Sequence, residues 1–112
     1  MQFKTHVLVL MALSACAPDE NQFLNEFVPH ECTWALSCFS DAALSFSGWD
    51  SQAACVDDLG TQIVTQTSEC TYDPESASLC LDHLDETTCT EDEAIALPLE
   101  CYDVYTSCES WL

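Results

Sequence analysis

Nine cysteines among 112 residues constrain the fold of this chain more than any other feature. A chain of this length forms one small domain, and such domains often need covalent cross-links to supplement a modest core. The cysteines do not occur in the closely spaced pairs that zinc sites and thiol–disulfide exchange motifs use. We therefore predict structural disulfides, which form in an oxidising compartment outside the cytosol.

The clearest helix signal lies between Cys70 and Cys89. Asp73 is a favourable N-cap, because its carboxylate can accept hydrogen bonds from the free amides of the first turn. Pro74 follows at the first helical position, where its missing N–H costs nothing. Apolar residues recur at helical spacing on one face: Ala77, Cys80, Leu81 and Leu84. The pattern predicts a short helix with one cysteine on its buried face and two more beyond its ends.

Two helices are predicted before this stretch. Pro29 marks the start of the first, and its apolar face consists of Cys32, Ala35, Leu36 and Phe39. Asp50 or Ser51 can cap the second. The apolar face of this second helix consists of Cys55, Val56, Leu59 and Ile63. Gly60 weakens its helix propensity by about 1 kcal/mol, and the polar residues 65–68 end it.

Two more helices are predicted after it. Thr90 and Glu93 match a capping box, which predicts a short helix that ends before Pro98. Pro98 then begins a last helix, whose seam consists of Cys101, Tyr105, Cys108 and Leu112. Strand signals are weak, since the β-branched residues 61–67 have no hairpin partner. The predicted fold is therefore all-α, a small disulfide-rich bundle of four to five short helices.

Eight cysteines are assigned to disulfides: Cys32, Cys38, Cys55, Cys70, Cys80, Cys89, Cys101 and Cys108. Within a helix, Cys32 and Cys38 are about 9 Å apart along the axis, too far to bond to each other. The same argument separates Cys101 from Cys108 if the last helix is continuous. The other pairings stay open, because eight cysteines allow about 105 connectivities.

The charge balance excludes whole classes of partner. The chain has 20 acidic residues and one basic residue, Lys4, and its formal net charge is -19. Nucleic-acid binding and docking on anionic lipid by charge are excluded, because both need basic groups. We expect self-repulsion that salt, calcium or mild acidification relieves. The charge is compatible with a protein partner that has a basic surface. It is also compatible with weak Ca²⁺ binding at Asp57-Asp58 or Glu91-Asp92-Glu93.

The N-terminus has the layout of a secretion signal: a short start with Lys4, followed by the apolar residues 7–13. This apolar stretch ends in Leu13-Ser14-Ala15-Cys16, which resembles the lipobox of bacterial lipoproteins. The resemblance covers sixteen residues and implies that Cys16 becomes the lipidated first residue of the mature protein. The alternative is ordinary secretion, with cleavage after Ala15-Cys16-Ala17. That cut would place Pro18 directly after the scissile bond, a poor arrangement for the usual peptidase.

This resemblance implies a signal peptide at residues 1–15 and a lipidated cysteine at the start of a short tether at 16–22. The helix patterns and cysteines predict a cysteine-rich helical domain at 23–112. Two or more acyl chains hold a protein firmly to a bilayer. The residues after Cys16 are Ala17 and Pro18, so the aspartate that retains some lipoproteins in the inner membrane is absent. We therefore expect anchoring in the outer membrane of a Gram-negative envelope, with the domain in the periplasm or at the cell surface.

A second resemblance covers about twenty residues. The pattern Cys70-x-Tyr72-Asp73-x3-Ala77-x2-Cys80-Leu81-x2-Leu84-x4-Cys89 resembles small cysteine-rich lipoproteins of myxobacterial type. The resemblance implies an envelope lipoprotein with a helical disulfide domain and supplies no activity.

No catalytic, cofactor-binding or metal-binding residues are predicted. His83 lies among acidic residues beside the polar face of its helix, which indicates a solvated side chain rather than a base or ligand. His30 has no obvious partner, and no nucleophile motif occurs. The sequence thus favours a non-enzymatic acidic module for interaction or structural support. The alternatives are a weak calcium-binding surface protein and a secreted inhibitor or effector.

Overall fold

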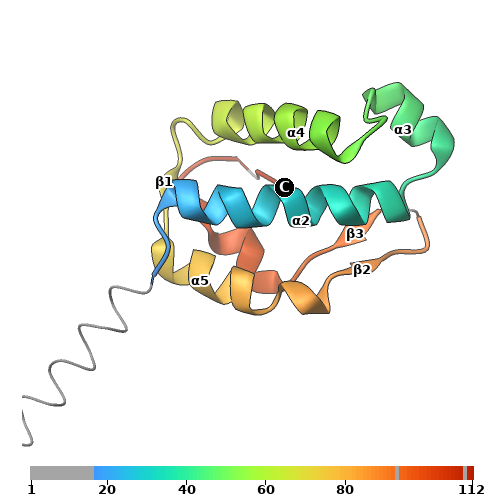
Figure 1. Cartoon of the computed structure of the whole chain (residues 1–112). Helices are drawn as coiled ribbons and strands as arrows, with labels where there is room; N and C mark the ends of the chain where they lie inside the picture. The colour runs from blue at the N-terminus through green and yellow to red at the C-terminus, as the bar shows by residue number, and fades with distance from the viewer. Residues whose placement is uncertain (1–16, 93, 110) are drawn as a thin grey trace, which may run out of the picture.

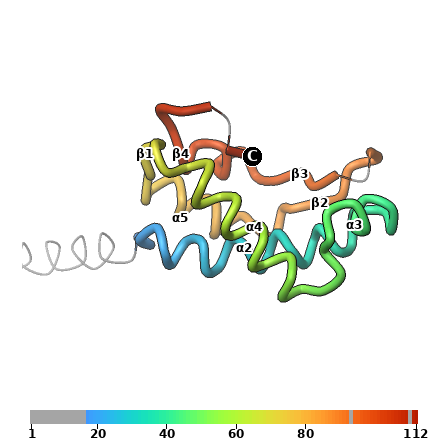
Figure 2. The backbone as a smooth tube through the Cα atoms, turned by 90° about the horizontal axis from the view of Figure 1, so that it is seen from above, coloured from blue at the N-terminus to red at the C-terminus, as the bar shows by residue number. Residues whose placement is uncertain are grey.

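The computed structural model describes residues 17–92, 94–109 and 111–112 of the chain. Helix α2 (Glu20–Cys38) runs through the middle of the domain, with α4 (Gln52–Gln66) along one side and α5 (Pro74–Asp82) along the other (Figure 1). The short helix α3 (Asp41–Ser47) lies at the end of the domain away from the start of α2 (Figures 1 and 2). Among the described residues, no helix is long and apolar enough to cross a bilayer.

Helix α2 begins well before Pro29, so the predicted start of this helix is wrong. The Asp19 carboxylate accepts a hydrogen bond from the Gln22 backbone N–H at 2.8 Å, and the Gln22 side chain accepts one from the Asp19 N–H at 3.0 Å. This capping box starts the helix at Glu20, and residues 20–22, predicted as tether, are helical. Burying Phe23 and Phe27 contributes roughly 3–6 kcal/mol. That outweighs the ~3 kcal/mol cost of Pro29 inside the helix.

The predicted starts of α4 and α5 are confirmed. Ser51 is the N-cap of α4, and its hydroxyl accepts from the Ala54 N–H at 3.1 Å. Asp73 is the N-cap of α5 and accepts from the N–H groups of Glu75 and Ser76 at 3.0 and 3.3 Å. These hydrogen bonds stabilise the carboxylate and lower the pKa of Asp73. A 3₁₀ turn, η1 (Leu84–Glu86), follows α5.

The last third of the chain differs from the prediction. In place of a helix after Thr90, strands β2 (Thr88–Cys89) and β3 (Ile95–Ala96) form an antiparallel hairpin. Thr90 closes its turn: its N–H donates to the Ala94 carbonyl at 2.8 Å, and its hydroxyl accepts from the Ala94 N–H at 3.2 Å. The hydroxyl expected to cap a helix therefore serves the hairpin. Glu93, the other half of the predicted capping box, lies outside the described residues.

The predicted last helix is also wrong. A short 3₁₀ helix, η2 (Leu99–Asp103), is followed by strand β4 (Tyr105–Thr106), which pairs antiparallel with β1 (Thr71–Tyr72). The pairing brings together segments that are far apart in the sequence, so no local pattern signals it. The domain is mainly helical and disulfide-rich, as predicted, but its short strands mean that it is not purely all-α.

Four disulfides join all eight of the cysteines assigned to cross-links: Cys32–Cys55, Cys38–Cys89, Cys70–Cys108 and Cys80–Cys101. Three bridges join two different elements: α2 to α4, α2 to β2 and α5 to η2. The fourth, Cys70–Cys108, joins the residue before β1 to the segment after β4. Neither excluded pair occurs. Cys32 and Cys38 share a helix as argued, whereas Cys101 and Cys108 are separated by η2 and β4 rather than by one helix. Each bridge contributes roughly 2–4 kcal/mol to folding.

The core is densest where α2 begins. Five rings form an aromatic cluster there: Phe23, Phe27, Tyr72, Tyr105 and Trp111. The ring centroids of Phe23 and Phe27 are 5.1 Å apart, and those of Tyr105 and Trp111 are 4.9 Å apart in an edge-to-face arrangement. The cluster joins α2, both strands of the β1–β4 pair and the end of the chain. Helix α3, by contrast, has no buried residue.

Candidate functional site: an apolar cavity around Glu31

A cavity of about 280 Å³ lies between α2 and α4. Apolar side chains from both helices form most of its wall, and the aromatic rings that line it are Phe27, Phe39, Trp49 and Trp111. Phe39 and Trp49 stack with their ring centroids 6.2 Å apart, which fixes one side of the cavity. The Trp49 indole N–H donates to Asp58 on α4 at 2.7 Å. We call this space the Glu31 cavity, after the one acidic side chain among the described residues that line it.

Glu31 is the unusual residue of this wall. It lies on the buried stripe of α2, where the other buried residues are apolar, and only 9% of its surface is exposed. Its Oε1 atom is buried and accepts no hydrogen bond from any residue that the structure describes. Burial penalises the charged form and raises the pKa of Glu31 to about 7.

A buried donor lies in the same wall. The indole Nε1–H of Trp111 is enclosed and has no hydrogen-bond partner within the described part of the chain. The Trp111 ring packs against Phe27, with a centroid separation of 5.3 Å, so the aromatic cluster holds it in place. An unpaired acceptor and an unpaired donor in one apolar cavity are costly for a protein alone. The arrangement can receive a small molecule with an apolar body and polar ends.

The sequence analysis missed this site. A signal was present, because Glu31 stands four residues from both Phe27 and Ala35 and therefore shares their helix face. The predicted helix begins at Pro29 and therefore excludes Phe27, the neighbour that places Glu31 on the buried face of α2. The contribution of Trp111 depends on how the end of the chain folds back, which no local pattern shows.

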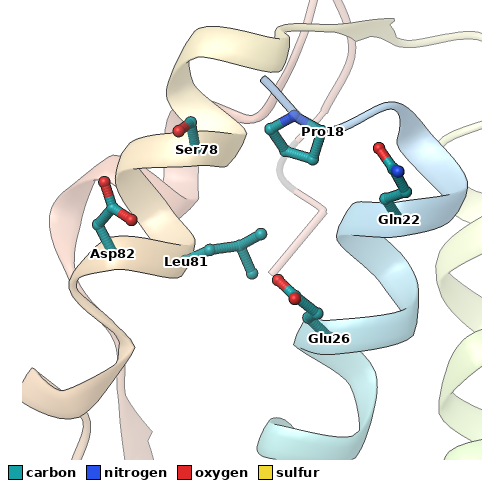
Figure 3. Close-up of a pocket in the computed structure, with 6 residues that line it drawn as sticks. All are labelled: Pro18, Gln22, Glu26, Ser78, Leu81 and Asp82. Carbon is teal, nitrogen blue, oxygen red and sulfur yellow. The ribbon is translucent and has the colours of Figure 1, made fainter. Parts of the chain in front are cut away.

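A second concavity, of about 320 Å³, lies between α2 and α5 (Figure 3). Figure 3 shows the Leu81 side chain of α5 extending toward Glu26 of α2, with Pro18 and Gln22 at the other end of the groove. The Pro18 carbonyl accepts a hydrogen bond from the Tyr72 hydroxyl at 2.8 Å, which fastens the segment before α2 to β1. This groove is polar and open, and it contains two carboxylates from opposite sides, Glu26 and Asp82.

The two histidines singled out in the sequence lie in different surroundings. His83 is partly exposed, and its Nδ1 lies 3.1 Å from Glu100 Oε1 and 3.9 Å from Glu86 Oε2. His30 lies within α2 and accepts a hydrogen bond from the Trp34 indole N–H at 3.2 Å. Burial lowers the pKa of His30, partly offset by the backbone carbonyl of Leu84. Neither histidine lines the Glu31 cavity.

Of the acidic runs considered for weak calcium binding, Glu91-Asp92-Glu93 includes Glu93, which lies outside the described residues. Among the described residues, no group of three or more histidine, cysteine, aspartate or glutamate side chains is arranged to hold a metal ion. Asp58 instead accepts hydrogen bonds from Trp49 and from Gln62, the latter at 2.8 Å. The Asp58 carboxylate therefore supports the local structure of α4.

Comparison with known proteins finds no matching family model, and neither a curated protein nor a solved structure matches the chain. Functional proposals for this protein therefore depend on its sequence signals and on the geometry of its own sites.

Proposed function

We propose that this protein is a lipid-anchored component of a Gram-negative cell envelope, tethered through acyl chains on Cys16 and placed at the outer membrane. Its mature part is a non-enzymatic, acidic, disulfide-stapled module that acts by interaction or as structural support. The domain faces the periplasm or the cell surface, and its charge suits a protein partner with a basic surface.

One observation carries the proposal. The eight cysteines after Cys16 pair with one another in four disulfides, so none of them is left to bond to Cys16. Cys16 is therefore the odd cysteine, and it stands at the lipobox position of Leu13-Ser14-Ala15-Cys16. Disulfide bonding of this density supports an oxidising location outside the cytosol.

The start of α2 supports a short tether. The helix cap is Asp19, so only Ala17 and Pro18 separate Cys16 from the folded domain. Tyr72 holds the Pro18 carbonyl against the domain. With an acylated Cys16, the β1–β4 end of the domain would therefore lie next to the membrane, and α3 would point away from it.

Intact-mass spectrometry tests the proposal. The full-length chain is expressed in a Gram-negative host, and the protein is recovered from the membrane fraction. We expect a polypeptide that begins at Cys16, carries the mass of a diacylglyceryl group with or without a third acyl chain, and lacks eight hydrogens because of four disulfides. A Cys16→Ser variant should keep the disulfides and lose the acyl mass. An unacylated wild-type chain that begins at any other residue would refute the anchor.

A further inference from the structure

We infer that the Glu31 cavity is a binding site for a small organic ammonium ion with an apolar body. The inference goes beyond the proposed anchoring role and concerns a different part of the molecule. It rests on the cavity of about 280 Å³, the buried carboxyl group, the aromatic walls and the absence of lysine and arginine after Lys4.

The first argument is the placement of Glu31. A carboxyl group at a buried position costs free energy unless a partner compensates it. The described residues offer Glu31 Oε1 no hydrogen bond. An internal salt bridge with lysine or arginine is impossible, because the chain contains neither after Lys4. Of the residues that the structure describes, only His30 and His83 could otherwise carry a positive charge, and neither lines the cavity. A cation that compensates an ionised Glu31 there therefore comes from outside the protein.

The second argument is the chemistry of the wall. Aromatic rings attract organic cations through their electron-rich faces, and tryptophan does so most strongly. Four aromatic side chains line the cavity, and two of them are tryptophans. A carboxylate combined with aromatic walls suits an ammonium group on an apolar body better than a hydrated metal ion, which needs several oxygen ligands.

The third argument is the field of the whole protein. All 20 acidic residues lie after Lys4, the one lysine or arginine of the chain. The domain therefore concentrates cations near its surface and repels anions and second copies of itself. The polar atoms of the cavity favour the same occupant. Glu31 supplies the negative charge that complements an ammonium group, and Trp111 contributes an aromatic ring to the wall.

Binding of 2-phenylethylammonium to the purified mature protein in non-ionic detergent tests this inference. Isothermal titration gives the affinity, and the NMR signal of the Trp111 indole N–H reports whether the ligand enters the cavity. Two matched probes keep the ring and change the charge: neutral 2-phenylethanol and anionic 3-phenylpropanoate. We expect the ammonium ion to bind more tightly than the alcohol, no binding of the anion, and a shift of the Trp111 signal.

Two variants distinguish binding in the Glu31 cavity from attraction by the net negative charge of the protein. Glu31→Gln removes the buried charge, whereas Glu26→Gln removes an exposed charge from the same helix outside the cavity. We expect Glu31→Gln to weaken ammonium binding at least tenfold and leave binding of the alcohol unchanged. Glu26→Gln should change neither.

Three results would overturn the inference. Equal losses in the two variants would mean that the net charge, not the cavity, attracts the cation. Equal affinities for the alcohol and the ammonium ion would show that the cavity binds the apolar ring and does not select for the positive charge. Absence of a Trp111 shift in the wild-type protein at saturating ammonium would exclude the cavity, and this measurement needs no variant to fold.

Discussion

The two ends of α2 are built differently. Where α2 begins, five aromatic rings from α2, β1, β4 and the chain terminus pack together, and Phe23 and Phe27 are fully buried. Where α2 ends, α3 has no buried residue, and Phe46 is 96% exposed. A disulfide, Cys38–Cys89, fastens this second end to the β2–β3 hairpin. The first end therefore combines hydrophobic packing with the Cys70–Cys108 bridge beside β1 and β4, whereas the second has a bridge but no buried residue in α3.

The largest difference between the two ends is expected in the loss of stability when one phenylalanine at each end is replaced with alanine. Phe23→Ala empties the centre of the aromatic cluster and should destabilise the domain by about 3–5 kcal/mol. Phe46→Ala removes the same side chain from the exposed face of α3 and should change stability by less than about 0.5 kcal/mol. Chemical denaturation under non-reducing conditions measures both. Similar losses in the two variants would show that α3 packs more tightly than the structure indicates.

The Cys38–Cys89 bridge should matter mainly for the end that it fastens. Replacing both cysteines with alanine should cost about 2–4 kcal/mol. The loss should appear locally, because few other contacts hold the β2–β3 hairpin to α2. Hydrogen exchange should accelerate at Thr90 and Ile95 while amides around Phe23 keep their protection. Uniform acceleration across the domain would instead mean that the two ends unfold as one unit.

Glu31 lies between the two ends and should make stability depend on pH. Its folded-state pKa of about 7 lies above the ordinary value of 4.5, so the folded protein holds this proton more tightly than the unfolded chain does. The resulting penalty is absent below pH 4.5, grows as the pH rises toward 7 and is complete above it. At alkaline pH it should reach up to about 3 kcal/mol.

Thermal unfolding of Glu31→Gln and wild type across this pH range measures the effect. The variant should match the wild type at the acidic limit and be the more stable protein above neutral pH. Glu26→Gln, the exposed control, should differ from the wild type by a small and nearly constant amount. A stability difference for Glu31→Gln that does not change with pH would contradict the assigned pKa.

Salt should stabilise both ends alike, since acidic residues occur throughout the domain and no lysine or arginine follows Lys4. Raising NaCl from about 10 mM to about 500 mM shortens the Debye length from about 30 Å to less than 10 Å. We expect a gain of about 1–2 kcal/mol, which calorimetry would record as a higher Tm. A Tm that stays flat over this range would show that self-repulsion does not limit stability.

The smallest effect concerns the segment before α2. Tyr72→Phe removes the hydrogen bond to the Pro18 carbonyl and should cost about 0.5–1.5 kcal/mol. Faster exchange of the Asp19 amide would accompany this loss, while the α3 amides should not change. Tyr102→Phe is the matched control, because Tyr102 is 45% exposed and lies outside the aromatic cluster.

The sequence was most informative where structure is determined locally. Ser51 and Asp73 cap their helices as predicted, because an N-cap depends only on residues of the following turn. The same logic could have found the Asp19–Gln22 capping box, but Pro29 offered a stronger apparent start. A capping motif consists of few residues, so it also occurs where no helix follows. Thr90 is an example, because its hydroxyl closes the turn of a hairpin instead.

Long-range structure could not be predicted in this way. The register of β1 with β4 pairs Thr71 with Thr106, and strands of two residues leave no alternation to detect. The disulfide connectivity follows from the same tertiary arrangement. The Glu31 cavity needs α2, α4 and the end of the chain together, so only the buried position of its carboxyl group was accessible from the sequence.

The central claim is that four internal disulfides leave Cys16 alone to carry the membrane anchor. Non-reducing peptide mapping of the protein isolated from membranes tests it most directly. We predict cross-linked peptides for Cys32–Cys55, Cys38–Cys89, Cys70–Cys108 and Cys80–Cys101, together with an acylated N-terminal peptide that begins at Cys16. A disulfide between Cys16 and any other cysteine, or a free thiol among the other eight, would contradict the account.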